Sequence, residues 1–276
     1  MLEFQLFRIK VYLSIITKKG RSEVLKESIL SSPVAEFRKG MTWHIGNISP
    51  IEEMGLYFRV GRTSTSKFEV YQNGNFTDQD FEIAPYTHAL LDFEHEIIAI
   101  ANKVKLAPRV IGIANNLINL LNQAPDNRSV GNSFEIDAIL DPDDFLMYLR
   151  KAYSVSKFWV RFARPNPWDV NEDFIKPTQE TLVALNGETG KTVIEGENLT
   201  TSKLEDIARS AAATGDDAGA SVKMTDSSPK IKRRLKGNPV YVEAEDILDA
   251  TYMKTLLLNI RNRYQAIRKG NKTDAK

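Results

Sequence analysis

The sequence contains no cysteine and only three histidines in 276 residues. The absence of cysteine excludes a disulfide-stapled scaffold and any metal site built from thiolates, and it fits a reducing compartment such as the cytoplasm, where we expect the protein. No apolar run reaches the roughly 18 residues that a membrane-spanning helix needs, so we expect no direct membrane insertion. Serine nucleophile elbows, Walker loops and G-x-G-x-x-G motifs are missing as well, so their chemistry has no support in the sequence.

The residues that are present indicate an ordinary globular protein. Hydrophobic residues make up 42% of the chain and charged residues 26%, and the length allows one large or two ordinary domains. The N-terminus alternates apolar and polar residues and carries Arg8 and Lys10 within the apolar run. This pattern predicts a first strand rather than a signal peptide.

The order of the predicted elements indicates an α+β fold. Strand-like segments follow one another to about residue 104, separated by turn residues such as Asn73-Gly74-Asn75, as is typical of antiparallel strands. Pro108 then begins a helix that is apolar almost all round, which predicts a buried helix joining two halves. The expected parts are a mainly antiparallel β-rich N-terminal domain (residues 1–104), a helical connector (105–130) and an α+β domain with a mixed sheet (131–276).

The clearest local pattern lies between Ser133 and Phe162. Residues 134–140 alternate as in a strand, and Asp141-Pro142-Asp143-Asp144 has the cap, the first-turn proline and the acidic residues of a helix N-terminus. Phe158, Val160 and Phe162 then predict a second strand. This strand-helix-strand unit predicts a core, but it carries no catalytic signature.

The net charge of +1 hides a separation of charge along the chain. Between Tyr71 and Asn102 every charged side chain is acidic, whereas basic residues far outnumber acids between Lys230 and Lys269. A chain sorted in this way predicts one surface that attracts polyanions and another that does not, although solvated surfaces that merely cluster are an equal alternative.

Two groups of residues resemble parts of catalytic sites. His88 and His95 lie near Asp92, Glu94 and Glu96, which suggests a histidine-carboxylate metal site, but a hairpin with polar surface groups is the favoured interpretation. A magnesium-dependent nuclease would need a lysine after acids such as Glu135 and Asp137, and none follows at the right place. The glycines around Gly190-Lys191-Thr192 have the wrong spacing for a phosphate loop and predict a hairpin turn instead.

The strongest functional signal is the basic segment Lys230–Lys236, which we expect to form an exposed loop or hairpin arm. Five of its seven residues are cationic, a density that neutralises several phosphates and gives sequence-tolerant, salt-dependent binding. A solvated charged hairpin is the alternative. The candidate phosphate contacts in this segment are Lys230, Lys232, Arg233, Arg234 and Lys236.

The predicted last helix, from Ile247 to about Lys269, carries a seam of apolar residues at alternating spacings of three and four. The seam consists of Ala250, Met253, Leu257, Ile260, Tyr264 and Ile267. Such a seam packs either into the core or against a second copy of the helix, and the latter predicts a homodimer with the seam near its two-fold axis. Cations run along one edge of the seam and extend the candidate nucleic-acid surface to Lys254, Arg261, Arg263, Arg268 and Lys269.

The order of elements between about residues 80 and 268 resembles the RexA-type phage-exclusion proteins and the related KwaB-like defence proteins. The residues that carry this resemblance are Leu90–Phe93 with Ile97–Ile100, Phe134–Phe162, and Ala220–Met224 with Lys230–Lys236. The resemblance implies an intracellular, often dimeric DNA-binding protein that detects phage replication and acts through a second protein component.

The sequence thus favours a non-enzymatic cytoplasmic protein of an antiviral system that binds the phosphate backbone, in the first place of double-stranded DNA, without a cofactor. Two alternatives belong to other classes: a metal-dependent nuclease or other nucleic-acid hydrolase, and a protein-interaction scaffold that uses the acidic β domain. Convergence of Asp92, Glu94, Glu135 and Asp137 in a cleft beside the basic surface would favour the enzyme, and dispersed acids would favour the binding protein.

Overall fold

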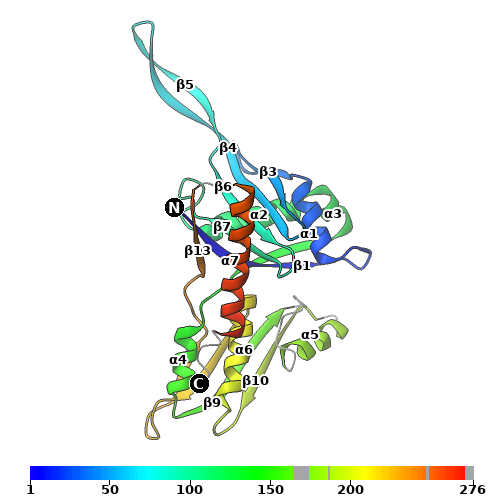
Figure 1. Ribbon diagram of the computed structural model, residues 1–276, viewed down its shortest axis with the longest axis vertical. Helices are drawn as coiled ribbons and strands as arrows, with labels where there is room; N and C mark the ends of the chain where they lie inside the picture. The colour runs from blue at the N-terminus through cyan, green and yellow to red at the C-terminus, as the bar shows by residue number, and fades with distance from the viewer. Residues whose placement is uncertain (164–173, 186, 247–248, 271–276) are drawn as a thin grey trace. The chain divides into compact units, whose positions relative to one another are not determined.

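The computed structural model describes residues 1–163, 174–185, 187–246 and 249–270 (Figure 1). The contacts within the chain define two compact units. Unit 1 comprises Met1–Gln5, Val11–Ile136 and Glu243–Lys254, and unit 2 comprises the described residues of Leu6–Lys10, Asp137–Val242 and Thr255–Lys276. Four elements contribute residues to both units: β1 (Leu2–Tyr12), β8 (Ser133–Ala138), β13 (Tyr241–Ala244) and α7 (Ala250–Lys269).

Unit 1 is organised around the larger of two sheets, whose strand order is β13-β1-β7-β6-β4-β3-β2, with β5 paired to β4 and β8 to β1. The strands that lie wholly in this unit are β2 (Val34–Arg38), β3 (Met41–Ile51), β4 (Gly55–Gln72), β5 (Asn75–Ile83), β6 (Tyr86–Asp92) and β7 (Ile97–Ala101). Each pairs with its neighbour in antiparallel fashion, which confirms the mainly antiparallel, β-rich character expected of the N-terminal part. The helices of this unit are α1 (Arg21–Leu30), α2 (Val110–Gln123) and α3 (Pro125–Val130).

Helix α2 differs from the buried connector that its composition predicts. It buries one side, including Ile113, Leu117 and Leu121, but Asn115 and Asn119 are exposed on the other. The helix belongs to unit 1 and contacts β2, β3 and β7 of that unit. The helix is therefore buried on one side only.

Unit 2 contains the smaller sheet, with the order β10-β9-β11-β12. Its strands are β9 (Ser154–Ala163), β10 (Thr189–Glu195), β11 (Asp217–Lys223) and β12 (Ile231–Arg234), and its helices are α4 (Asp143–Lys151), α5 (Ile175–Ala184) and α6 (Thr201–Thr214). All three strand pairings are antiparallel, so the predicted mixed sheet is wrong although the α+β class is confirmed. The predicted strand-helix-strand unit is present as β8, α4 and β9.

One face of the smaller sheet is packed. Phe158 and Val160 of β9 and Ala220 of β11 are buried, and α6 contacts both strands with a face that includes Leu204 and Ala211. Residues at alternate positions of the same strands point to the opposite face, because strand side chains alternate. None of the helices that the structure describes is both long and apolar enough to span a membrane. The start of the last helix that the sequence predicts, Ile247, lies outside the described residues.

Candidate nucleic-acid interface

The basic segment Lys230–Lys236 forms an edge strand of the smaller sheet rather than a loop. Its central residues are β12, paired with β11 so that Lys232 lies opposite Ser221 and Arg234 opposite Gly219. Lys232 and Arg234 are exposed, whereas Leu235 is buried and holds the end of the strand against the unit. The segment is therefore one strand of a hairpin, as one of the two expected forms required. Because successive side chains of a strand point to opposite faces, its cations are divided between the two faces of the sheet.

Arg233 points to the packed face of the sheet. Its guanidinium carbon lies 4.3 Å from the centroid of the Tyr148 ring on α4, and the side chain is half-buried. A cation over an aromatic face stabilises packing, so Arg233 joins β12 to α4. Of the candidate phosphate contacts in this segment, Arg233 therefore lies on the face of the sheet opposite to Lys232 and Arg234.

The opposite face of the sheet is centred on Trp159 of β9. The antiparallel registers place Val193 of β10 and Gly219 of β11 directly beside it, so the three residues share one face. The Lys191 ammonium lies 4.7 Å from the indole centroid, and the Arg234 guanidinium carbon lies 5.8 Å from it. Two cations from strands on either side of β9 therefore lie against the same aromatic ring.

Gly219 allows the indole to extend over β11. A Cβ atom at this position would lie 2.8 Å from two atoms of the Trp159 ring and 2.7 Å from the backbone oxygen of Arg233. Both distances are too short for a side chain, so glycine is required here by close approach and not by its backbone angles.

Cations predominate on this face, which we call the cationic face. Its acids are Glu195 and Asp217, which form ion pairs with Lys157 (2.5 Å) and Arg234, respectively. Among the described residues no ion partner is found for the other three cations of the face, Arg161, Lys191 and Lys232. With five cations and two acids, the face has a net charge of +3. The cationic face consists of Lys157, Arg161, Lys191, Lys232 and Arg234 around Trp159, with the two acids.

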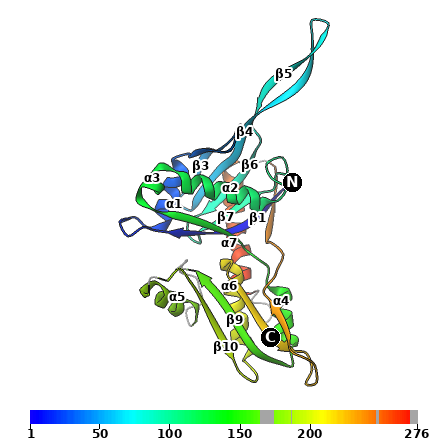
Figure 2. The ribbon, with the colours of Figure 1, turned by 180° about the vertical axis from the view of Figure 1, so that it is seen from behind.

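The cationic face is exposed. Val193 is 43% exposed beside Trp159, and Arg161, Lys191 and Lys232 are exposed as well. Figure 2 shows β9 and β10 from the side opposite to α6. The sheet thus has one face packed by helices and one face on which charge surrounds a half-buried aromatic ring, and that combination suits a ligand with phosphates and flat rings.

The cations of α7 are placed differently. Lys254 forms an ion pair with Glu52 (2.7 Å), and Arg263 lies 3.6 Å from Asp141. Arg261 and Arg268 are half-buried, and only Lys269 among the remaining cations of this edge is exposed. The continuous basic track that the sequence predicts is therefore interrupted by ion pairs along the helix.

The apolar seam of α7 lies in the core. Leu257, Ile260 and Tyr264 are completely buried, and the Tyr264 hydroxyl accepts a hydrogen bond from Arg8 (2.7 Å). A buried side chain cannot also pack against a second molecule. The prediction that the seam lies at a dimer axis is therefore wrong, and the alternative of core packing is confirmed.

The acids that were candidates for catalysis have local partners. The Asp92 carboxylate lies 2.8 Å from Nδ1 of His95, Glu135 accepts a hydrogen bond from the Tyr12 hydroxyl (2.8 Å), and Asp137 lies 2.8 Å from the Lys10 ammonium. His88 bonds to the Tyr57 hydroxyl at 2.8 Å instead of joining a ligand set. Within the described ranges, no group of three or more acids and histidines is arranged to hold a metal ion.

Lys10 of unit 2 occupies a buried polar site. Its ammonium lies 2.8 Å from Asp137 and 3.2 Å from Asp216, which also accepts a hydrogen bond from Thr214 (2.9 Å). Burial raises the pKa of the Asp216 carboxyl. Burial by itself lowers the pKa of Lys10, but the two aspartates raise it above its ordinary value. This triad fixes β1 in unit 2.

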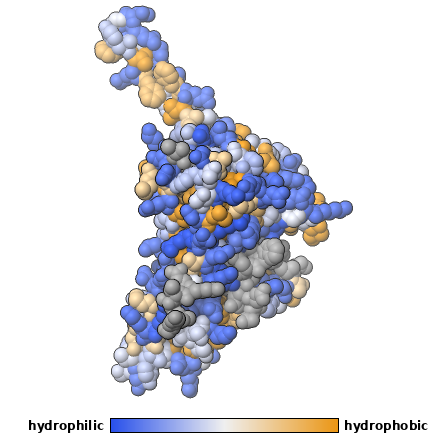
Figure 3. All heavy atoms as spheres, in the orientation of Figure 1, coloured by the Kyte–Doolittle hydropathy of each residue, from blue (hydrophilic) through white to orange (hydrophobic). Residues whose placement is uncertain are grey.

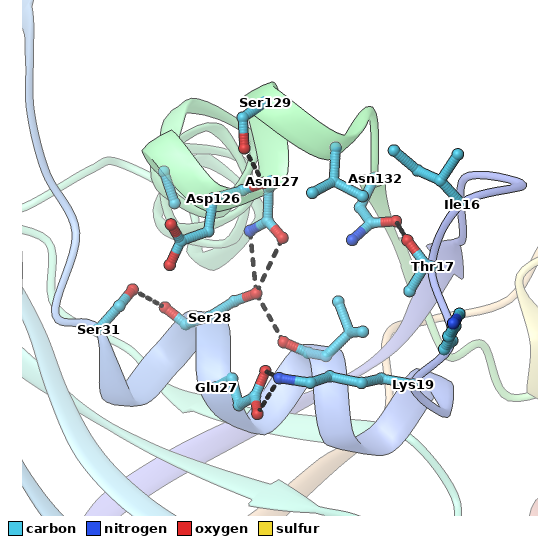
Figure 4. Close-up of a pocket in the computed structure, with 14 residues that line it drawn as sticks. Ile16, Thr17, Lys19, Glu27, Ser28, Ser31, Asp126, Asn127, Ser129 and Asn132 are labelled. Atoms are coloured by element: carbon cyan, nitrogen blue, oxygen red, sulfur yellow. Dashed lines mark hydrogen bonds and ion pairs between the residues drawn. The ribbon is translucent and has the colours of Figure 1, made fainter.

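A pocket of about 400 Å³ in unit 1 offers no reactive group (Figure 4). It lies between α1, α3 and the loop after β1, and several of its polar side chains bond to one another. Asn127 donates to the Ser28 hydroxyl (2.9 Å), Thr17 donates to Asn132 (2.7 Å), and Lys19 is paired with Glu27 (2.6 Å). These mutual bonds favour a structural cleft over a catalytic one.

The sequence interpretation missed the residues at the centre of the cationic face. Trp159, Lys157 and Arg161 alternate with the apolar residues that predict β9, and this period of two was the signal that could have revealed them. Lys191 was placed in a turn, but it lies in β10.

Comparisons with known proteins do not identify the chain. No protein-family model matches it, and no curated protein sequence is significantly similar to it. The resemblance to the RexA-type and KwaB-like proteins therefore stays a prediction.

Proposed function

We propose that this protein binds nucleic acid through the cationic face of the smaller sheet, without acting as an enzyme on it. The observation that carries the proposal is the combination of five cations with Trp159 on one exposed face, while the reverse side of β9 and β11 is buried against helix α6. Phosphates are neutralised by Arg161, Lys191 and Lys232, and the release of their counterions provides most of the affinity. Contacts to the phosphate backbone position the protein on the nucleic acid but give little sequence specificity.

Trp159 gives the face a second kind of contact. Bases that are not paired can stack on the accessible part of a half-buried aromatic ring, and cations beside the ring hold the adjoining phosphates. Duplex DNA presents its phosphates but not its base planes. The proposal therefore extends the expected duplex binding to single strands, which can use both the cations and the ring.

The local pairing of the acids supports binding rather than hydrolysis. Asp137 is paired with buried Lys10, and Asp92 is completely buried beside His95. Magnesium-dependent cleavage requires carboxylates that are available to the metal. Cleavage of plasmid DNA by magnesium or manganese, lost in Asp137→Ala, would contradict the non-enzymatic proposal.

The test is a titration of labelled single-stranded and duplex oligonucleotides of two unrelated sequences. The variant Arg161→Gln/Lys191→Gln/Lys232→Gln should bind all of them more weakly by a similar factor, because the lost contacts are to phosphate. Unchanged affinity in this variant would refute the proposed interface.

The biological setting is proposed from the resemblance of residues 80–268 alone. We propose that the protein acts in the cytoplasm in an antiviral or phage-exclusion system, together with a second protein component. Expression in a phage-sensitive bacterium that supplies the second component should reduce plaque numbers for the unaltered chain but not for the triple variant. Equal protection by both would separate any defence role from the cationic face.

A further inference from the structure

The outer half of β4 and strand β5 form a two-stranded ribbon that extends beyond the sheet of unit 1 (Figure 1). Beyond Ser64, β4 pairs with β5 and with no other strand among the described residues. The ribbon closes at Asn73-Gly74, whose φ values of 51° and 81° are those of a tight hairpin turn. Isolated two-stranded hairpins are marginally stable in water, so a ribbon of this length needs further contacts.

The register of the ribbon separates its residues into two unlike faces. Paired residues share a face, and the pairs Lys67–Asp80, Glu69–Asp78 and Thr65–Glu82 place all five charged side chains of the ribbon on one side. The other side carries no charge. This uncharged face is defined by the pairs Ser66–Phe81, Phe68–Gln79 and Val70–Thr77.

The uncharged face exposes large aromatic side chains. Phe68 and Phe81 pack edge to face with centroids 5.7 Å apart, yet they remain 49% and 43% exposed. Figure 3 shows hydrophobic side chains gathered along the ribbon. An exposed aromatic surface on a narrow ribbon is costly in water, so its presence indicates a surface that is covered in a complex.

The charges on the ribbon restrict how a second copy could bind. Pairing two β5 strands edge to edge in full register, centred on Gln79, would place Asp78 of each copy opposite Asp80 of the other. Like charges directly opposite each other destabilise a sheet, and charges are a common protection of exposed edges. Edge-to-edge pairing is therefore disfavoured.

Stacking of the uncharged faces avoids this repulsion. A two-fold axis between two ribbons brings Phe68, Val70 and Phe81 of each copy against the same surface of the other, and no charge meets another charge. The acids of both copies then point away from the contact into water, as do Tyr71 and Phe76, which lie on the same side near the turn. The uncharged face is thus complementary to itself, whereas the charged face is not.

We infer that two copies of this chain associate through the uncharged faces of their β4–β5 ribbons, stacked like the two sheets of a β-sandwich. The apolar face is buried in the dimer, and the two-stranded ribbon gains the second layer that it lacks as a monomer. This contact replaces the α7 seam as the dimer surface, and it does not depend on the proposed nucleic-acid binding.

The test is the mass of the full chain measured by light scattering over a concentration series. The unaltered chain should approach twice 31.2 kDa, and Phe68→Thr/Phe81→Thr should remain at 31.2 kDa. Threonine suits an exposed strand, so circular dichroism should be unchanged. The matched control, Glu69→Gln/Asp78→Asn, alters the charged face of the same strands and should remain dimeric.

Two outcomes overturn the inference. One is a monomeric unaltered chain, which would leave the ribbon to a different partner, and the other is a double variant with the same mass as the unaltered chain. Because the chain has no cysteine, a single introduced cysteine can be crosslinked without competing thiols. This second measurement detects the dimer directly and does not depend on disrupting it. A flexible bismaleimide should join two copies of Val70→Cys but not of Glu69→Cys, and equal yields would contradict the stacked arrangement.

Discussion

The cationic face of unit 2 and the β4–β5 ribbon of unit 1 both expose aromatic side chains on antiparallel strands, but they place their charges differently. On the cationic face, Lys191 and Arg234 lie directly against the ring of Trp159. On the ribbon, every charge lies on the side opposite to Phe68 and Phe81. Tyr71 and Phe76, near the turn, lie on the charged side, so only the face around Phe68 and Phe81 is free of charge. Mixing cations with a ring suits a charged, flat-ringed ligand such as nucleic acid, and an uncharged face with exposed rings suits an apolar protein contact.

A second comparison, between β12 and α7, shows why the density of charge does not define a binding surface. Both segments are strongly basic, but Lys254 and Arg263 of α7 lie beside acids, whereas Lys232 of β12 is exposed on the cationic face. The helix pairs Lys254 and Arg263 with acids of the fold, whereas the strand presents Lys232 to solvent.

The largest expected effect distinguishes the core seam of α7 from its exposed side. Leu257→Glu places a charge at a completely buried position and should cost several kcal/mol, on the order of 3–5, enough to unfold the chain. Leu258→Glu changes the next residue, which is 41% exposed, and should cost less than about 0.5 kcal/mol. Thermal unfolding followed by circular dichroism compares the two, and a folded monomeric Leu257→Glu chain would restore the seam as a dimer surface.

The next effect separates the aromatic residues of the two surfaces. Trp159→Leu removes the ring from the cationic face and should weaken single-strand binding by about 1–3 kcal/mol, with a smaller loss for duplex. Phe76→Leu removes a more exposed ring, 84% accessible at the tip of the ribbon, and should leave binding unchanged. Fluorescence anisotropy with both ligands gives the comparison. Equal losses for Trp159→Leu on single strands and duplex would argue against stacking.

Neighbouring cations of β12 test whether the two faces of that strand have separate roles. Lys232→Gln should lower nucleic-acid affinity by up to about tenfold at 0.1 M salt, because one phosphate contact is lost. Arg233→Gln removes the cation from Tyr148 and should instead lower the unfolding free energy by about 0.5–1 kcal/mol, with affinity retained. A reversed pattern in the titration and unfolding data would show that the faces have been assigned wrongly.

The smallest effect concerns pH and lies outside both surfaces. Burial, with Arg59 and Lys103 nearby, lowers the pKa of His88 below its ordinary value. The unfolded chain therefore takes up this proton first, and stability should fall as pH drops from about 7 through the folded pKa. His88→Gln should flatten this acid limb in a series of melting curves, and an unchanged limb would exclude His88 as its cause.

Sequence patterns predicted the elements whose contacts are local. The alternation and capping residues between 134 and 162 predicted β8, α4 and β9, and Asn73-Gly74 predicted the hairpin turn. The face of each strand depends on distant pairing. Trp159 meets Arg234 only because β11 lies between β9 and β12, and no local signal specifies that order.

Two patterns in the sequence were equally consistent with different structures. The spacing of Leu257 and Tyr264 fits a core as well as a coiled-coil dimer, because both bury the same stripe. Gly190-Lys191 has the composition of a turn, but pairing with Arg161 and Phe162 of β9 draws it into a strand. In both cases tertiary contacts decided the outcome.

The most direct test of the cationic face is the salt dependence of nucleic-acid affinity in two variants that lose the same charge. Lys191→Gln/Lys232→Gln removes two cations from the cationic face, and Lys151→Gln/Lys203→Gln removes two exposed cations from helices of the same unit. The first variant should bind more weakly, with a slope of log affinity against log salt flatter by about two units, and the second should match the unaltered chain. Equal slopes in the two variants would show that net charge, and not this face, holds the nucleic acid.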